Sequence, residues 1–198
     1  AVSPNGQYAA VVIENERDED VTVAGVEGGL PQLPAGYLNI IDLIGAPDHW
    51  EVRKVDLTGL ASYGSDDPEP EFVSINQNNI AAVTLQENNH IVFVNLVSGK
   101  LLQNFNAGNV TLEGIDTVDN KLIDFTSTLA DVAREPDAVA WLDNDRIITA
   151  NEGDLFGGSR GFSVFNRSGK VVYDSGNKFE YLAAAVGHYP EKRSDNKG

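Results

Sequence analysis

The feature of this sequence that most constrains its fold is an internal repeat of four strand-sized segments. The clearest copy spans residues 69–105, with apolar runs at 72–75, 80–85, 91–96 and 101–105 separated by Asn, Ser and Gly turns. The runs are rich in β-branched residues, which favour strands. In the last turn, Gly99 stands where a tight hairpin needs a positive φ. The pattern predicts a four-stranded antiparallel meander.

Two further copies of this unit flank the first. Glu-Pro-Asp at 135–137 repeats Glu-Pro-Glu at 69–71, and Ser-Gly-Lys at 168–170 repeats Ser-Gly-Lys at 98–100. Another copy opens the chain, with strands expected at 8–13, 37–43 and 50–57. Repetition of a four-stranded unit is typical of a β-propeller, because a single blade cannot bury both of its faces alone and stacks on its neighbours.

The repeat predicts an all-β chain that forms one partial propeller domain over residues 1–198. Blade one is expected at 1–57, blade two at 69–105, blade three at 135–176, and a C-terminal connection at 177–198. Because closed propellers have roughly four to eight blades, we expect a piece of a longer propeller, whose remainder would be its partner. Between the blades we expect a turn of helix at 129–134, stopped by Pro136, and after them a helix at 179–186.

The net charge of the chain limits the kinds of molecule that it is expected to bind. The net charge of -16, from 30 acidic and 14 basic residues, disfavours nucleic acid and anionic membrane surfaces and favours cations. The absence of Cys excludes disulfides, thiolate metal sites and Cys nucleophiles. No apolar run approaches the roughly 20 residues of a membrane span. The long acidic insertion at 14–36 predicts a functional or ordered surface loop.

Acidic residues recur at one end of the predicted blades. The chain entering the first strand and the turn leaving the second lie at the same end, because adjacent strands are antiparallel. Crowded carboxylates raise one another's pKa or require a cation, and Ca²⁺ takes about six to eight oxygen ligands. The alternative is that these side chains bind backbone N–H groups or face solvent. The candidate calcium ligands are Glu69, Glu71, Glu87, Glu135, Asp137, Glu152 and Asp154, with Glu14, Glu16 and Asp18 on the same rim of blade one.

Other motifs give weaker indications of chemistry. Residues 157–161 match G-x-S-x-G, but a strand rather than a helix is expected to follow, which favours a hairpin over a nucleophile. The three histidines lack the spacing of a zinc site. Trp50 and Trp141 fall on predicted strands, where aromatic side chains more often belong to the core than to a ligand site.

Several segments resemble a known family. They are DPEPEFVSI, VTLQENNHIVFVNLVSGK, EPDAVAW, TANEGD and RGFSVFNRSGKVVYDSGNKFE, with the closing RSDNKG. They are similar to the choice-of-anchor I propellers, which are also labelled alkaline-phosphatase-like or esterase-like phytase proteins. The resemblance implies a seven-bladed, extracytoplasmic protein, periplasmic, secreted or on the cell surface, of bacterial origin. It supplies no established catalytic residues.

Two functions of different class follow. The first is a binding or interaction module whose acidic rim binds calcium or a surface ligand, with Asn88, Asn151 and Arg160 as candidate ligand-binding residues. The alternative is a calcium-dependent phosphoric-ester hydrolase of phytase or alkaline-phosphatase type, which needs basic groups to receive phosphate. An acidic rim poor in Lys and Arg attracts metal and repels free phosphate, which favours the first function. The candidate phosphate-binding groups are Arg17, Arg134, Arg160, Lys192 and Arg193.

Overall fold

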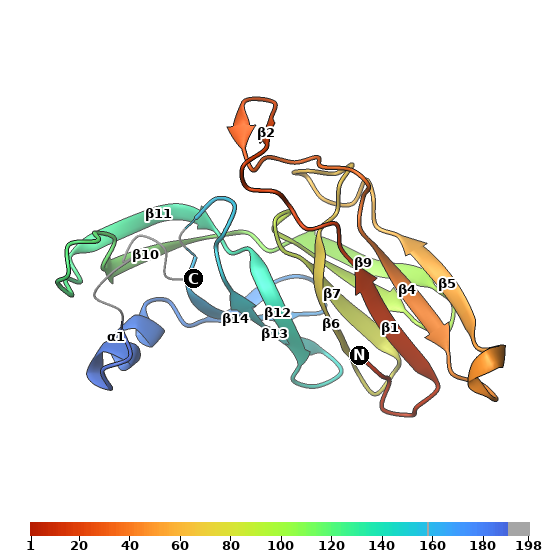
Figure 1. The fold of residues 1–198 in the computed structure, drawn as a ribbon. Helices are drawn as coiled ribbons and strands as arrows, with labels where there is room; N and C mark the ends of the chain where they lie inside the picture. The colour runs from red at the N-terminus through yellow and green to blue at the C-terminus, as the bar shows by residue number, and fades with distance from the viewer. Residues whose placement is uncertain (158, 190–198) are drawn as a thin grey trace.

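The computed structural model describes residues 1–157 and 159–189, and its architecture is all-β, as predicted. Three antiparallel sheets follow one another along the chain and lie side by side (Figure 1). A short helix, α1 (Lys178–Ala185), comes after the last sheet and matches the helix expected at 179–186. Residues from 190 onward, including the candidates Lys192 and Arg193, and residue 158 of the G-x-S-x-G match lie outside the described residues.

The first sheet contains β1 (Tyr8–Ile13), β4 (Tyr37–Asp42) and β5 (Glu51–Asp56), in that order. An isolated bridge pairs Val2 with Ala9 beside β1. A 3-10 turn, η1 (Pro47–His49), precedes β5. Along β4 the buried positions alternate, with Leu38 and Ile40 at 0% exposure, as a strand with one covered face requires.

The second sheet is the one predicted from the clearest repeat. Its order is β6 (Pro70–Ile75), β7 (Ile80–Leu85), β8 (His90–Asn95) and β9 (Lys100–Asn106). Every residue of β7 is buried, which indicates a strand covered on both faces. Alternate residues of this strand enter two different cores. Ala81 and Val83 pack with the first sheet, whereas Ile80 and Ala82 pack with the third.

The third sheet has the order β12 (Pro136–Trp141), β13 (Arg146–Asn151), β14 (Gly161–Asn166) and β15 (Val171–Asp174). Strand β6 lies against both β1 and β12, so the first-listed strands of the three sheets are neighbours. Hydrogen bonds also join the second and third sheets. Thr84 Oγ1 donates to the carbonyl of Asp137 at 2.6 Å, and Trp141 Nε1 donates to the carbonyl of Ser74 at 3.1 Å.

Two hairpins lie outside these sheets (Figure 1). The first, β2 (Thr22–Val23) with β3 (Val26–Glu27), belongs to the acidic insertion at 14–36. The second is β10 (Asn109–Ile115) with β11 (Ser127–Ala133). The turn of helix expected at 129–134 is therefore wrong, because backbone groups of this segment pair with β10, as at Val110 and Val132. Pairing with a partner strand overrides local helix propensity.

The two tryptophans differ in environment. Trp50 lies just before β5 and is 40% exposed, so its expected place on a strand in the core is wrong. Its indole N–H reaches only the carbonyl of Gly45, at 3.4 Å in the loop before η1. Trp141 ends β12 and packs against Phe93 of the second sheet, with ring centroids 5.1 Å apart.

Candidate metal centre

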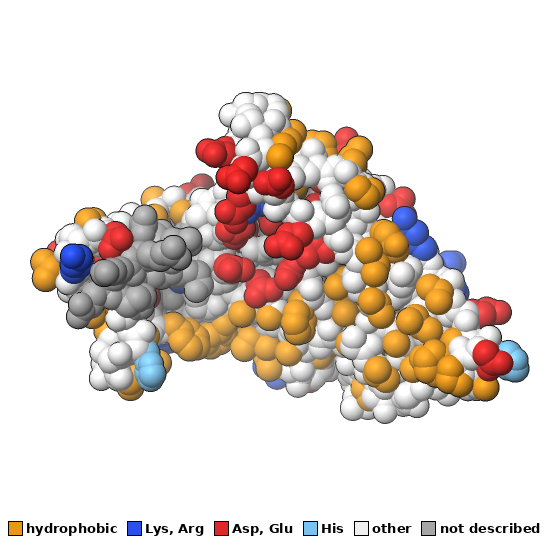
Figure 2. Space-filling view, viewed as in Figure 1, with side chains coloured by type: hydrophobic (Ala, Val, Ile, Leu, Met, Phe, Trp, Pro, Cys, Tyr) orange, Lys and Arg blue, Asp and Glu red, His pale blue; other side chains and the backbone are white. Residues whose placement is uncertain are grey.

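A cluster of carboxylates lies at one end of the sheets and joins three segments of the chain. Glu14 follows the last residue of β1, Glu69 precedes the first residue of β6, and Glu87 lies in the turn between β7 and β8. One carboxylate oxygen from each of these three residues lies within 4.8 Å of the others. We call these three residues the carboxylate cluster. Figure 2 shows acidic side chains gathered on this face of the molecule, below the β2–β3 hairpin.

Glu69 is the most constrained member of the cluster. Its side chain is 0% exposed, and no hydrogen-bond donor among the described residues reaches either carboxylate oxygen. Burial, with the nearby charges of Asp67 and Glu87 as the next causes, raises its pKa to about 9. Burying a carboxylate without a donor is costly. A proton on Glu69, which its carboxyl group can donate to that of Asp67, or a cation must therefore offset the charge of Glu69.

The neighbouring carboxyl groups are perturbed in the same direction. Burial raises the pKa of Glu14 to about 8, with the carboxyl group of Glu71 as the next cause. Burial also raises the pKa of Glu87 and of Asp67. Asp67 Oδ2 accepts the backbone N–H of Gln32, whereas its Oδ1 and Glu87 Oε2 are buried without a donor among the described residues. Several buried oxygens therefore lack a positive partner.

Among the described residues, Arg17 is the basic residue that contacts the carboxylate cluster. Its Nε donates to Glu87 Oε1 at 3.3 Å, and its Nη2 forms an ion pair with Asp154. Its Nη1 donates to the carbonyl of Gly28 at 3.4 Å. The guanidinium thus connects the insertion to the second and third sheets. It neutralises only one side of the cluster, because it reaches Oε1 and not Oε2 of Glu87.

The acidic residues of the third sheet form a neighbouring group. Glu135 is 0% exposed, its Oε1 accepts the backbone N–H of Phe156 at 2.8 Å, and burial raises its pKa to about 7. Burial raises the pKa of Asp137 and of Glu152, with Glu71 as a further cause for both. These predicted ligands therefore influence one another electrostatically, next to the carboxylate cluster rather than within it.

The remaining predicted rim residues lie further toward solvent. Asp154 is exposed and pairs with Arg17. Glu16 and Asp18 of the insertion are exposed, and Asp18 Oδ1 accepts the backbone N–H of Asp20. Glu14 and Asp67 contribute more to the buried site than these residues do. Asp67 was not among the predicted ligands, although it precedes Glu69 by two residues in the same repeated entrance segment.

Asn88 and Asn151, predicted to bind ligand, form hydrogen bonds inside the protein. Asn88 Oδ1 accepts the backbone N–H of Glu69 at 2.8 Å, and its Nδ2 donates to backbone carbonyls of the 63–67 loop. Asn151 Nδ2 donates to Ser163 Oγ at 2.9 Å, and its Oδ1 accepts the hydroxyl of Thr149 at 2.8 Å. Asn88 therefore positions the backbone of Glu69 and holds the 63–67 loop against it.

Two arginines that were candidates for phosphate are also engaged elsewhere. Arg160 donates to the carbonyl of Asp116 at 3.0 Å and pairs with Glu180 of α1. Arg134 pairs with Asp174 at 3.1 Å and donates to the carbonyl of Ala107 at 3.0 Å. Both are buried. Of the arginines considered, Arg17 is the one that contacts the carboxylate cluster.

The fold and the site together define an all-β repeat protein with a partly buried cluster of carboxylates at one end of its sheets. The family model described as the choice-of-anchor I domain matches residues 3–157. The chain belongs to the choice-of-anchor I family, which associates it with the cell surface or the exterior. The structure shows no helix, within residues 1–157 and 159–189, that is long and apolar enough to cross a membrane.

Other comparisons add little. No curated protein sequence matches the chain. Among solved structures, the chain is similar to Kuenenia stuttgartiensis hydrazine synthase, with 14% sequence identity and a TM-score of 0.48. The match covers 86% of this chain and 45% of that one, so the chain spans less than half the length of that protein. A likeness of this degree says nothing about function.

Proposed function

We propose that this chain is part of a surface-associated β-propeller that acts as a binding module and holds calcium at the carboxylate cluster. The repeated antiparallel sheets support the propeller, because their first strands are neighbours and each pair of adjacent sheets shares a core. In this arrangement β1, β6 and β12 lie on the side of the sheets toward a common axis. The remaining blades would come from the rest of the propeller.

One observation supports the metal site above the others: Glu69 is fully buried, and both of its oxygens lack a donor among the described residues. Asp67, Glu14 and Glu87 add further oxygens, and the cluster includes neither His nor Cys. A set made only of oxygens favours Ca²⁺ or Mg²⁺ over zinc or copper. Calcium suits the site better, since it tolerates irregular geometry and carboxylates from separate loops.

Calorimetry tests this proposal. We expect Ca²⁺ titrated into chelator-treated protein to release or absorb heat with a saturable isotherm, and Glu69→Gln and Glu87→Gln to weaken binding at least tenfold. Glu113→Gln is the matched control, because Glu113 is exposed on β10, away from the cluster. Absence of calcium binding by the unmodified protein, or equal loss in the control, would contradict the proposal. Mg²⁺ in parallel titrations establishes the preference between the two ions.

The alternative function, a phosphoric-ester hydrolase, is tested by measuring the turnover of phosphate esters. A phosphoric-ester hydrolase needs a basic group free to receive phosphate beside the metal, whereas Arg17 is already bound by Glu87 and Asp154. We therefore expect no turnover of p-nitrophenyl phosphate or phytate with or without calcium. Calcium-dependent turnover that Glu69→Gln abolishes would replace the binding module by the hydrolase.

A further inference from the structure

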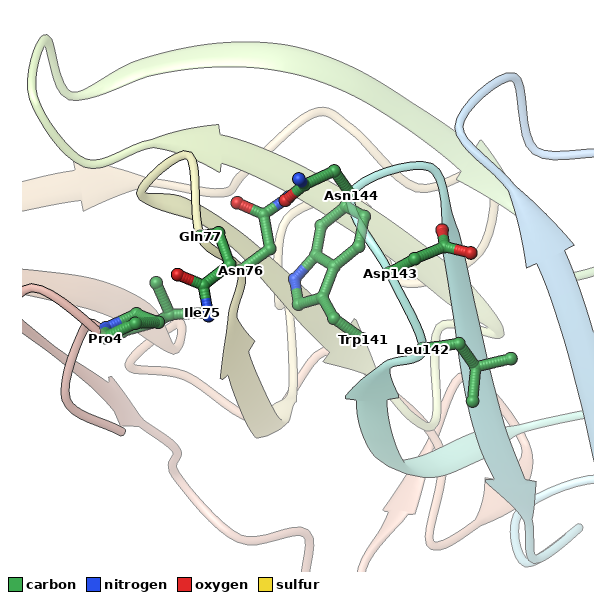
Figure 3. Close-up of a pocket in the computed structure, with 8 residues that line it drawn as sticks. All are labelled: Pro4, Ile75, Asn76, Gln77, Trp141, Leu142, Asp143 and Asn144. Atoms are coloured by element: carbon green, nitrogen blue, oxygen red, sulfur yellow. The ribbon is translucent and has the colours of Figure 1, made fainter.

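A cavity of about 250 Å³, shown in Figure 3, lies at the end of β6 that is remote from the carboxylate cluster. Strand β6 runs from the cluster to this cavity, because it begins after Glu69 and ends at Ile75. The cavity is bounded by the turn after β6, the turn after β12 and the N-terminal segment. Its lining includes Pro4, Ile75, the amides of Asn76, Gln77 and Asn144, and the indole of Trp141.

Asn76 presents a buried donor at this cavity. Its Oδ1 accepts the backbone N–H groups of Asn78 at 2.9 Å and Ile80 at 3.0 Å, which fixes the plane of the carboxamide. The residue is 4% exposed, and its Nδ2 has no acceptor among the described residues. A buried N–H without an acceptor is unfavourable, because it has lost its hydrogen bonds to water. The donor is thus in place for an acceptor that the described part of the chain does not provide.

The turn itself does not need this donor. Asn166, in the turn between β14 and β15, makes the same bonds, with Oδ1 accepting the N–H groups of Ser168 and Lys170 at 3.0 Å. In the turn after β12, a carboxylate oxygen of Asp143 takes the place of the amide oxygen and accepts the N–H groups of Asp145 and Arg146, both at 2.8 Å. An acceptor is therefore sufficient for these turns. The turn that contains Asn76 therefore needs only its Oδ1, and the Nδ2 donor has no role in the turn.

Trp141 gives the cavity an apolar surface. Its ring packs against Phe93, and its Nε1–H is already bonded to the carbonyl of Ser74. The part of the indole that lines the cavity therefore offers carbon atoms rather than a free donor. In Figure 3, Pro4 and Ile75 lie on one side and Trp141 on the other, with Asn76 and Gln77 between them. Apolar ring surface thus faces a set of amides.

The cavity carries little net charge. Asp143 is the charged residue that lines it, and both Nε and Nη2 of Arg146 donate to its Oδ2, at 2.8 and 2.7 Å. Among the described residues, a phosphate or a cation would find no uncompensated partner of opposite charge there. An aromatic surface combined with amide donors and acceptors instead suits a neutral ligand that has one apolar face and a rim of hydroxyl groups.

We propose that this cavity binds a neutral saccharide, with a sugar ring against Trp141 and a hydroxyl or ring oxygen accepting from Asn76 Nδ2. The volume is below the roughly 300–1,000 Å³ of sites for drug-sized ligands. The cavity therefore holds one or two sugar rings rather than a long segment of chain. This binding is independent of calcium at the carboxylate cluster, so the two proposals can fail separately.

Fluorescence titration of the full chain tests the saccharide site. The chain has two tryptophans, so a Trp50→Phe background leaves Trp141 as the reporter. The probes are glucose, galactose, mannose, N-acetylglucosamine, maltotriose and chitotriose, with triglycine as a neutral acceptor that is not a sugar. We expect saturable change in Trp141 emission with at least one sugar, at a Kd on the order of 1 mM for a single ring.

Matched variants assign the binding to Asn76. Asn76→Asp keeps the acceptor of the turn and removes the donor, so we expect about tenfold weaker binding, whereas Asn166→Asp in the equivalent turn should leave the Kd unchanged. Gln77→Ala changes an exposed residue of the lining and should weaken saccharide binding severalfold. This variant replaces Asn76→Asp as the test if Asn76→Asp does not fold. No response to any sugar, equal binding of triglycine, or an unchanged Kd in the lining variants would overturn the proposal.

Discussion

Glu69 shows how a single residue can have two opposite effects. Its backbone is held in place by Asn88, which accepts its N–H, while its carboxylate is buried beside other carboxylates without a donor among the described residues. The fold therefore fixes the position of a carboxyl group whose charged form it does not stabilise. This combination is expected for a ligand that awaits a cation, and it is unfavourable when the cation is absent.

Replacing this residue should therefore stabilise the metal-free protein. We expect Glu69→Gln to raise the free energy of unfolding at pH 8 by about 1 kcal/mol and the Tm by roughly 2–4 °C, because the amide is neutral in both states, whereas Glu69, with its pKa raised to about 9, must take up a proton when the metal-free chain folds. Differential scanning calorimetry in the presence of a chelator measures the change. With saturating calcium the order should reverse. If Glu69→Gln is less stable than the unmodified protein in chelator, the interpretation that the buried carboxyl group of Glu69 destabilises the metal-free protein is wrong.

The sequence allowed some of these residues to be predicted. Glu69 and Glu135 stood out because the entrance segment is repeated, and both prove to be fully buried. Asn88, however, could not be separated from a ligand by pattern alone. Its bonds are to backbone groups of the 63–69 segment, which depends on how a loop folds over the end of the sheet. Residue type gives the chemistry of a side chain but not its partner.

At the scale of elements, the insertion at 14–36 is anchored to the sheets rather than free. Arg17 connects it to Glu87 and Asp154, and the backbone N–H of Gln32 bonds to Asp67. The insertion thus supplies Glu14 to the carboxylate cluster and Arg17 to its edge. Its order should depend on these polar contacts, because apolar burial within it is sparse apart from Leu30.

Limited proteolysis tests this dependence. We expect Arg17→Gln to increase the rate of cleavage within 18–29 severalfold, because local opening no longer breaks the ion pairs with Glu87 and Asp154. Arg17→Lys should give an intermediate rate, since it keeps the charge but not the planar fork that contacts both carboxylates. Cleavage sites are identified by mass spectrometry. Equal rates for all three proteins would show that other contacts hold the insertion.

A second prediction for an element concerns the β14–β15 turn, where Gly169 adopts a φ of +83° against the second sheet. A Cβ there would lie 2.5 Å from Phe105 Cγ of β9. Gly6→Ala provides the control, because Gly6 also has a positive φ of +68° but nothing within 4 Å of the added Cβ. Both variants pay the left-handed backbone cost of about 1 kcal/mol.

The difference between the two variants therefore isolates the steric clash. We expect urea unfolding to show Gly169→Ala to be less stable than Gly6→Ala by a further 1–3 kcal/mol, roughly the cost of overpacking. If the two variants lose equal stability, the turn does not press on the neighbouring sheet as the structure has it.

Elements were predicted well where the repeat was clear and poorly between repeats. Strands β1 and β7 have the predicted bounds, because apolar runs bounded by turn residues fix them. Part of strand β11 was predicted to be a turn of helix, since the eleven residues that separate it from its partner β10 do not form a short hairpin turn that would have indicated the pairing. Short segments of mixed character take the structure that their partner imposes.

At the scale of the whole molecule, the sheets depend on one another. The second sheet contributes alternate side chains to two cores, one shared with the first sheet and one with the third. The internal repeat predicted stacked sheets, but not which groups meet at their ends. Those positions depend on the angle between sheets and on loops of unequal length, which a linear repeat does not encode.

The carboxyl groups that meet at these ends predict that the stability of the whole molecule depends on pH and, through the proposed site, on calcium. The pKa values of Glu69, Glu14 and Glu135 are raised by burial to about 9, 8 and 7, well above the roughly 4.3 of an unfolded Glu. The folded metal-free protein therefore holds protons that the unfolded chain has released. By linkage, its free energy of unfolding falls as the pH rises from about 5 to 9.

Calcium should reverse this trend, because it replaces the protons and binds best once the carboxyl groups are ionised. We expect the Tm in chelator to fall steadily between pH 5 and pH 9, and the increase in Tm produced by millimolar calcium to be smallest at pH 5 and largest at pH 9. Glu69→Gln should flatten both dependences, whereas Glu113→Gln should follow the unmodified protein. A calcium effect that is independent of pH would mean that the ion binds away from the buried carboxylates, because exposed groups with ordinary pKa values are already ionised across this range.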